Sequence, residues 1–371
     1  MRTPPLVALT LLLGCGAPPS AGDAGAGGGG GSATAGGGSA MSGGSAAGGS
    51  ATGGGSATGG GSATGGGSAT GGGSATGGGS AVGGGSSAGG NPYSGIDPLA
   101  DAGPAVLVDG GFQFTEGPQW VPWLGGLVFS DIPADRIFLL SPPTTISTFL
   151  TPTGNSNGIA LHPSGDLVIC QHQGQVVRRQ PDGGTSVVAS QFDGGRLNSP
   201  NDAIVRSDGT IYFTDPTYGG TGTVGTRGVY RVTATGELSR LYSTNTGQPN
   251  GVALSPDESV LYVADSQLSE VRRFDVAPDG TTSNGARFTL TSAGGPGGNG
   301  GDGIAVDVNG NLYVTTSVGV KVYRPDAGYL GRIQVGQQPA NCAFGDPDRR
   351  TLYITARTGL YRVRLNVPGP Y

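Results

Sequence analysis

From residue 105 onward, the chain alternates short apolar runs with polar turns. The stretch Asn201–Asp215 is representative, because a brief apolar run is followed by Arg, Ser, Asp and Gly and then by Ile-Tyr-Phe-Thr. Two apolar runs rich in β-branched and aromatic residues around such a turn are typical of a β-hairpin. No helical periodicity of useful length accompanies them, so the pattern predicts an all-β protein.

This unit occurs six times, and successive copies begin 39 to 52 residues apart. The copies begin at Glu116, Asn157, Asn201, Asn250, Asp302 and Asn341. Further strand-like runs lie between them, for example residues 228–232. A period of 40–50 residues with several short strands per unit is typical of propeller blades. We therefore predict a six-bladed β-propeller of four-stranded antiparallel blades.

The last copy supplies only three clear strands before the chain ends. Residues 105–114 precede the first copy and also have the pattern of a strand. We expect this N-terminal strand to complete the last blade, because closing the ring protects an otherwise exposed sheet edge.

The region before the repeats has a different composition. The 77 glycines are spread unevenly and crowd into residues 25–90, where they alternate with Ser, Ala and Thr. Such a segment cannot bury enough apolar surface to offset its chain entropy, so we interpret residues 16–91 as a flexible, disordered tether with a span of roughly 45–50 Å. Low-complexity drift without a selected length is the alternative. The propeller is assigned to residues 92–371.

The first fifteen residues indicate export. Arg2 precedes the apolar run 6–13, which has signal-peptide proportions, and Leu-Leu-Gly-Cys15 resembles a bacterial lipobox. We predict a lipoprotein signal peptide over residues 1–15, with lipidation at Cys15. The protein would then be an exported bacterial lipoprotein in the periplasm or at the cell surface, and its lipid would be its only membrane contact. Because Gly16 is not Asp, an outer-membrane anchor is plausible if the cell has an outer membrane. An ordinary secreted protein with a chance cysteine is the alternative.

Charge and the remaining cysteines narrow the picture further. The net charge is −5 and no Lys/Arg run is present, which argues against a nucleic-acid partner. Cys170 and Cys342 fall in strand-like runs of different repeats. An extracytoplasmic location would permit a disulfide, but we expect both thiols to be free and buried.

The first residue of every copy carries a side-chain carbonyl or carboxylate. Because the first strand of each blade lines the channel of a propeller, these six groups should converge at one end of it. Oxygen donors of this kind suit a hard cation such as Ca²⁺ or Mg²⁺. Each residue alone would be read as part of a turn, since Asn-Gly and Asp-Gly are turn dipeptides. The complete set of six favours a metal site.

Five motifs in order carry a resemblance to a known family. They are Glu116-Gly-Pro-Gln-Trp120, Arg196-Leu-Asn-Ser-Pro-Asn-Asp202, Pro249-Asn-Gly251, Asp302-Gly303 and Thr355-Ala-Arg-Thr-Gly-Leu-Tyr-Arg362. Together they resemble the gluconolactonase, senescence-marker-protein and luciferin-regenerating-enzyme family, and within it the bacterial gluconolactonase branch. The resemblance implies a six-bladed propeller with one divalent metal, most often Ca²⁺, held by Glu116, Asn201, Asn250 and Asp302. Mg²⁺, Mn²⁺ and Zn²⁺ are alternatives. Asn157 and Asn341 would then be pocket residues that bind substrate, or structural residues.

One position departs from the animal members of that family. They carry an Arg two residues before the third-blade Asn, where it helps to bind the sugar acid, whereas this chain has Ser199. The departure leaves the identity of the substrate open.

The second strand of each copy returns toward the same end of the channel. Its last residue is Asp131, Asp215 or Asp265 in three copies, with His172 and Arg357 one residue further on in two others. We expect acid, base and cationic groups there. Asp302, Asp265 and His172 are the candidate acid/base residues, and Arg357 and Tyr218 are candidate substrate contacts. A purely structural histidine is the alternative, and His162 is expected in a far turn.

These features predict a metal-dependent hydrolase that opens a small lactone, such as a sugar lactone. No serine-nucleophile motif of the Gly-x-Ser-x-Gly kind, set on a strand-to-helix elbow, is evident, so serine-hydrolase chemistry is not expected. Two alternatives stay open: a non-catalytic tethered binding module with a structural cation, and a related organophosphate esterase with the same four ligands. The expected partner is a small lactone or ester, and the oligomeric state is left open.

Overall fold

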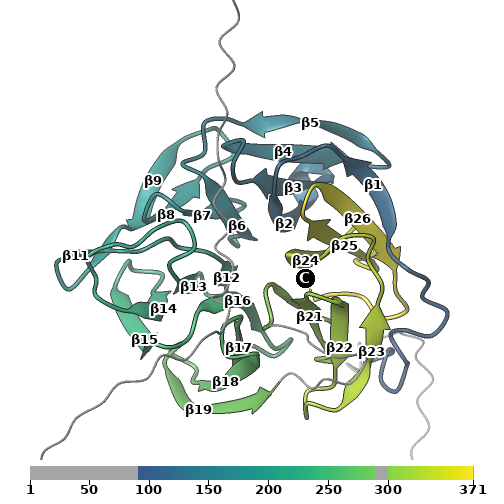
Figure 1. The fold of residues 1–371 in the computed structure, drawn as a ribbon. Helices are drawn as coiled ribbons and strands as arrows, with labels where there is room; N and C mark the ends of the chain where they lie inside the picture. Colours follow the sequence, from purple (N-terminus) through teal and green to yellow (C-terminus); the bar gives the residue numbers. More distant parts are fainter. Residues whose placement is uncertain (1–90, 290–299, 371) are drawn as a thin grey trace, which may run out of the picture. The chain divides into compact units, whose positions relative to one another are not determined.

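The computed structural model describes residues 91–289 and 300–370, which form a ring of six four-stranded antiparallel sheets (Figure 1). The ring is the six-bladed β-propeller that the repeats predict. The signal peptide, Cys15 and the tether up to residue 90 lie outside the described residues, so they stay predictions. Within the described part, no helix is both long and apolar enough to cross a membrane.

Each blade runs outward from the centre of the ring (Figure 1). Blade 1 is β2 (Thr115–Val121), β3 (Gly126–Asp131), β4 (Arg136–Ser141) and β5 (Thr145–Leu150). Blade 2 is β6 (Ser156–Leu161), β7 (Leu167–Gln171), β8 (Gln175–Arg179) and β9 (Thr185–Ala189). Blade 3 is β12 (Ala203–Val205), β13 (Ile211–Asp215), β14 (Arg227–Val232) and β15 (Leu238–Thr244). Between blades 2 and 3, the chain forms two paired strands of two residues each, β10 (Gln191–Phe192) and β11 (Gly195–Arg196).

The second half of the ring repeats this arrangement. Blade 4 is β16 (Pro249–Leu254), β17 (Val260–Asp265), β18 (Glu270–Val276) and β19 (Thr282–Thr289). Blade 5 is β20 (Ile304–Val306), β21 (Leu312–Thr316), β22 (Gly319–Tyr323) and β23 (Tyr329–Ile333). Blade 6 is β24 (Asn341–Gly345), β25 (Thr351–Ala356), β26 (Gly359–Arg364) and β1 (Val106–Gly110).

The N-terminal strand closes the ring as predicted. β1 pairs antiparallel with β26, with Val106 opposite Arg362 and Gly110 opposite Gly359. Figure 1 shows the earliest described strand beside the last one of the chain. Because the first and last segments share one sheet, blade 6 gains its fourth strand from the opposite end of the sequence.

The hydrophobic core lies between neighbouring blades. At the junction of blades 1 and 6, the Trp120 ring stacks on Tyr353 with centroids 6.3 Å apart, and both side chains are buried with Leu127 and Leu360. Equivalent clusters pack the other blades against each other. Cys170 and Cys342 are buried in two of these clusters as free thiols, which confirms the sequence prediction.

A glycine after the donor residue lets neighbouring first strands approach closely around the centre. A Cβ at Gly158 would lie 2.4 Å from the Asp202 carboxylate, and one at Gly251 would lie 2.3 Å from the Asp302 carbonyl oxygen. Any larger residue would push two blades apart. Blade 3 has Asp202 at this position instead, so one carboxylate occupies the space that the neighbouring glycine leaves free.

The C-terminal residues lie across the far end of the first strands. The Val308 amide donates to the Pro368 carbonyl at 3.0 Å, and the Gly369 amide donates to the Arg349 carbonyl at 2.8 Å. Pro370 helps to line a cavity of about 130 Å³ with residues of the first strands, including Asp202 and Asn341. In Figure 1 the C-terminus lies near the middle of the ring.

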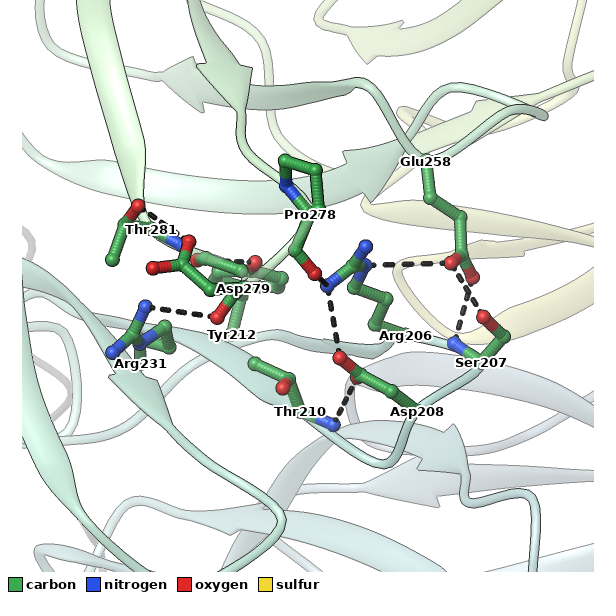
Figure 2. Close-up of polar contacts among 11 residues, drawn as sticks. Arg206, Ser207, Asp208, Thr210, Tyr212, Arg231, Glu258, Pro278, Asp279 and Thr281 are labelled. Carbon is green, nitrogen blue, oxygen red and sulfur yellow. Dashed lines mark hydrogen bonds and ion pairs between the residues drawn. The ribbon is translucent and has the colours of Figure 1, made fainter.

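A polar cluster, which we name the blade 3–4 clasp, joins blades 3 and 4 (Figure 2). Its Arg206, Asp208 and Glu258 lie in the turns that follow the first strands, at the opposite end of those strands from the donor residues. Arg206 donates to Asp208 and to the Pro278 carbonyl, each at 2.8 Å, and pairs with Glu258 at 3.5 Å. The buried Tyr212 hydroxyl donates to the Gly280 carbonyl at 2.7 Å. The clasp therefore ties the β18–β19 turn of blade 4 onto blade 3.

Candidate metal and substrate site

Eight residues that the sequence singled out meet in one cavity of about 260 Å³. The cavity lies where the first strands begin. Those eight residues are Glu116, Asn157, His172, Asn201, Tyr218, Asn250, Asp302 and Arg357. They come from loops and strand ends of all six blades, so no single blade forms the site.

The three asparagines form a directed chain of side-chain amides. Asn157 Nδ2 donates to Asn201 Oδ1 at 2.7 Å, and Asn201 Nδ2 donates to Asn250 Oδ1 at 2.6 Å. All three side chains are buried. Their orientation is thus fixed from blade to blade, and each carbonyl oxygen keeps a second lone pair for another partner.

Hydroxyl groups of the second strands hold the backbone of the donor residues. Thr214 Oγ1 in blade 3 donates to the Asn250 carbonyl of blade 4 at 2.7 Å, and Ser130 Oγ in blade 1 donates to the Asn157 carbonyl of blade 2 at 2.7 Å. All four residues are buried. Each donor is therefore positioned by the preceding blade as well as by its own strand.

Three carboxyl groups share the centre of the ring. Burial, and then the nearby Asp302 carboxylate, raise the pKa of Glu116 well above its ordinary value. Burial, and then Asp202, raise the pKa of Asp302 to about 7, although hydrogen bonding from Asn250 and the charge of Arg357 oppose the shift. Burial likewise raises the pKa of Asp202 to about 6. Like charges brought together away from water disfavour their own ionisation.

The donor set fits a divalent cation. A bound cation would offset the mutual repulsion of these carboxylates at the centre of the ring. Asn157 Oδ1 is buried and has no hydrogen-bond partner among the described residues, so a further acceptor is available. Neutral and anionic oxygens in combination are the ligands that Ca²⁺ and Mg²⁺ prefer. Glu116, Asn201, Asn250 and Asp302 would hold such an ion.

Comparison with known proteins identifies the family. The model of the SMP-30/gluconolactonase/LRE-like region matches residues 114–358. The chain belongs to this family. The match spans the first strand of blade 1 to the turn before β26, and so it contains every cavity residue named above.

Individual relatives agree with this assignment. A gluconolactonase from Zymomonas mobilis is 32% identical over 301 residues, which cover 72% of this chain and 82% of the relative. Pentonolactonase XacC from Haloferax volcanii is 28% identical over 264 residues, which cover 68% and 84%. The solved structure of a gluconolactonase from Xanthomonas campestris aligns with a TM-score of 0.66 at 32% identity and covers 72% of this chain and 91% of that one.

His172 and Arg357 add an imidazole and a guanidinium group to the residues that line the cavity. His172 Nε2 lies 3.0 Å from Asn157 Nδ2, which donates to it, so the neutral ring carries its proton on Nδ1. Burial lowers the pKa of His172. Arg357 is exposed at the rim, where it donates to Gln338 Oε1 at 2.7 Å. As expected, His162 lies in a far turn, beside Ser164.

The aspartates at the ends of the second strands accept hydrogen bonds from backbone amides of nearby loops. Asp265 Oδ1 accepts the amides of Gln248, Gln267 and Leu268 at 2.9–3.1 Å, and Asp131 accepts those of Gln113 and Phe114. Both carboxylates lie outside the residues that line the cavity. This placement corrects the expectation that these aspartates face the site, because their side chains turn toward the loop that enters the same blade.

Asn341 lies outside the larger cavity, which favours the structural alternative for this residue. Its Oδ1 accepts the amide of Cys342 at 2.8 Å, and the residue lines the smaller cavity on the other side of the donor ring. The substrate cavity is lined at this position by Pro339 and Ala340 instead. Five of the six first residues therefore converge on one cavity, and the sixth lies behind them.

Sequence reasoning left the role of Asp202 unassigned. Its two oxygens accept the amides of Ala203 and of Val252 in the next blade, at 3.0 and 3.2 Å. The usable signal was the residue that follows each donor, which is glycine in blades 1, 2, 4 and 5 but aspartate in blade 3. A carboxylate at a position that is glycine in four of the six copies indicates a group that lies at the centre.

Proposed function

We propose that this protein is a metal-dependent hydrolase that opens a small lactone, such as a sugar lactone, with Ca²⁺ as the favoured ion. The observation that carries the proposal is one cavity in which Glu116, Asp302 and the amide chain face His172 and Arg357. The relatives named as lactone hydrolases support the reaction class. A structural neighbour described as a calcium-binding regucalcin, from Agrobacterium tumefaciens, supports the choice of ion.

Glu116, Asn201, Asn250 and Asp302 would hold the cation. When bound, it would polarise the lactone carbonyl and lower the pKa of a water molecule. The amide chain keeps the two asparagine oxygens directed inward, so these ligands need little reorganisation when the ion enters.

The chain's own groups account for the proton transfers. Asp302 lines the cavity together with Glu116, and its carboxylate can accept a proton as water attacks the acyl carbon. The bond between the acyl carbon and the ring oxygen then breaks, and the ring oxygen takes up a proton to give a hydroxy acid. His172, neutral and bonded to Asn157, fixes the start of the amide chain. Arg357, the cation at the rim, faces the carboxylate of the product.

Lactone hydrolysis by the purified protein tests this proposal. D-Glucono-1,5-lactone and a panel of small lactones would be assayed with Ca²⁺, with chelator, and in the Asp302→Ala variant. Asp208→Asn in the blade 3–4 clasp is the matched control, because it removes an aspartate far from the cavity.

The expected result is turnover that needs the ion and Asp302 but not Asp208. A folded protein that binds Ca²⁺ but opens no lactone would instead indicate the binding module. Faster hydrolysis of phosphotriesters than of lactones would indicate the esterase.

We also propose that the protein is exported and anchored through a lipid on Cys15. The apolar run before Cys15 and the lipobox-like quartet support this localisation. Expression of the full chain in a bacterium with radiolabelled palmitate should label the wild type and not Cys15→Ala. Equal labelling of both chains would contradict the anchor.

A further inference from the structure

Ser199, the position where the sequence departs from the animal members of the family, holds together a segment above the cavity. The side chain is fully buried. Its Oγ donates to the Pro216 carbonyl at 2.9 Å and accepts the amide of Gly219 at 3.1 Å. One hydroxyl thus bridges both ends of the segment 216–219. We name residues 216–222 the roof segment.

The roof segment is also fastened at both sides. The Thr217 amide donates to Gln248 Oε1 at 3.1 Å, and the Tyr218 hydroxyl hydrogen-bonds Ser266 Oγ. Gln248 and Ser266 belong to the loops that flank β16 and β17 in blade 4. At the other end, the Gly222 amide donates to Asn198 Oδ1 at 3.0 Å. The segment therefore spans from blade 3 to blade 4.

The roof segment bounds the cavity on the His172 side. Tyr218 and Ser266 both line the cavity. Gly219 packs directly on the imidazole, since a Cβ there would lie 2.4 Å from both Cβ and Cγ of His172. His172 is in this way held between Gly219 and Asn157, and its position depends on where the roof segment lies.

We propose that Ser199 is a positioning residue that holds the roof segment in place. The roof segment in turn limits how large a substituent on the lactone ring can be if the lactone is to fit the cavity. This inference rests on the proposed lactone hydrolysis. The cavity of about 260 Å³ is smaller than the usual range for drug-sized ligands. The favoured substrate class is therefore a compact lactone with polar substituents, and we expect a lactone with a long alkyl chain to be opened less efficiently.

Two variants separate the hydroxyl from the steric contact. Ser199→Ala removes both hydrogen bonds to the roof segment and leaves the rest of the side chain in place. Gly219→Ala keeps those bonds but inserts a methyl group against His172. Ser255→Ala is the control, because it removes a buried hydroxyl that bonds Asp257 in a turn at the opposite end of blade 4.

The readouts are kinetics and amide hydrogen exchange over residues 216–222. D-Glucono-1,5-lactone is compared with δ-dodecanolactone, whose ring carries a long alkyl chain. Ser199→Ala should speed exchange in the roof segment and raise KM for gluconolactone about threefold to tenfold, with kcat nearly unchanged and with selectivity against dodecanolactone reduced. Gly219→Ala should lower kcat/KM for gluconolactone without faster exchange. Ser255→Ala should change neither readout.

Unchanged exchange and unchanged selectivity in Ser199→Ala, in a protein whose wild type opens gluconolactone, would overturn the inference. A wild type that opens neither lactone would overturn the proposed function instead, and exchange in the variant would then still decide whether Ser199 holds the roof segment.

Discussion

The two ends of blade 3 treat charge in opposite ways. At the blade 3–4 clasp, Arg206 lies between Asp208 and Glu258, so each charge meets one of opposite sign within the protein (Figure 2). At the other end, where the first strands begin and which we call the donor end, Glu116 and Asp302 lie beside Asp202. The positive charge of Arg357 opposes that of Asp302, but Arg357 is exposed at the rim of the cavity. The clasp pairs charges of opposite sign, whereas the donor end brings carboxyl groups together.

The pKa values of two aspartates express this contrast. At Asp208 burial would raise the pKa, but the Thr210 amide and hydroxyl and the Arg206 charge outweigh it and lower the pKa. At Asp302 burial and Asp202 together raise it to about 7. In a polar cluster that stabilises a fold, the charged groups pair with one another. In a functional site, some charged and polar groups are left to interact with a ligand.

The largest effect should come from neutralising the donor end. Asp302→Asn should reduce lactone turnover by about 10²–10⁴-fold, because it removes both a ligand and a proton acceptor. Without added metal, the same variant should unfold at a higher temperature, since one of three like charges is gone. Asp208→Asn should do the reverse at the clasp, with turnover kept and the unfolding temperature lowered. Thermal unfolding and initial rates measure both, and a destabilised metal-free Asp302→Asn would break the comparison.

A second buried aspartate with a raised pKa should give a pH-dependent stability. Burial raises the pKa of Asp215 from 3.8 to about 7 against the opposing hydrogen bonds of Asn198. The folded state thus holds this proton more tightly than the unfolded chain. The resulting stabilisation is fully present below pH about 4 and is lost as the pH rises through about 7, by roughly 2–4 kcal/mol. Urea unfolding across this range should show the decline in the wild type and a flatter profile in Asp215→Asn.

Ca²⁺ should stabilise the donor end and leave the clasp untouched. At an ion concentration of 100 times Kd, the free energy of unfolding should rise by about 2.7 kcal/mol. Glu116→Gln should lose most of this gain, while Asp208→Asn should keep it. Urea unfolding at increasing CaCl₂ measures the shift, and an equal gain in both variants would place the ion elsewhere.

The smallest effect should come from opening the clasp. Arg206→Met should lower the free energy of unfolding by about 1–3 kcal/mol, because partly buried acceptors lose their donor. Turnover should not change. Arg364→Met is the matched control: its pair with Asp348 is exposed, so the loss should stay within about 0.5 kcal/mol. Comparable losses in the two variants would show that the clasp is no stronger than a surface ion pair.

The sequence predicted the fold closely because the repeats are local. Each apolar run and its turn form a hairpin from neighbouring residues, so the six copies could be recognised before any contact was known. The closing strand was also predictable, since β26 needed a partner and residues 105–114 had no other one. Glu116, Asn157, Asn201, Asn250 and Asp302 were found at the cavity for the same reason, as equivalent positions of one repeat.

What the sequence did not settle depends on side-chain direction and on contacts between blades. Asp265 ends its strand as the repeat requires, but its carboxylate turns to three loop amides instead of the cavity. Asn341 is equivalent to the other donors, yet it lies behind them. From the sequence, Ser199 was notable only because the animal members of the family have an arginine there. The structure adds that its hydroxyl bonds a carbonyl and an amide of the roof segment.

The sequence by itself determined the number of blades, their strand order and the set of oxygen donors, because these follow from a short repeating pattern of apolar and polar residues. Only the tertiary structure decided which donors share a cavity, that Asp202 joins Glu116 and Asp302 at the centre, and which residues cover the site. Those features arise where separate blades meet, and the distance between two blades is set by packing across the ring rather than by any one stretch of the chain.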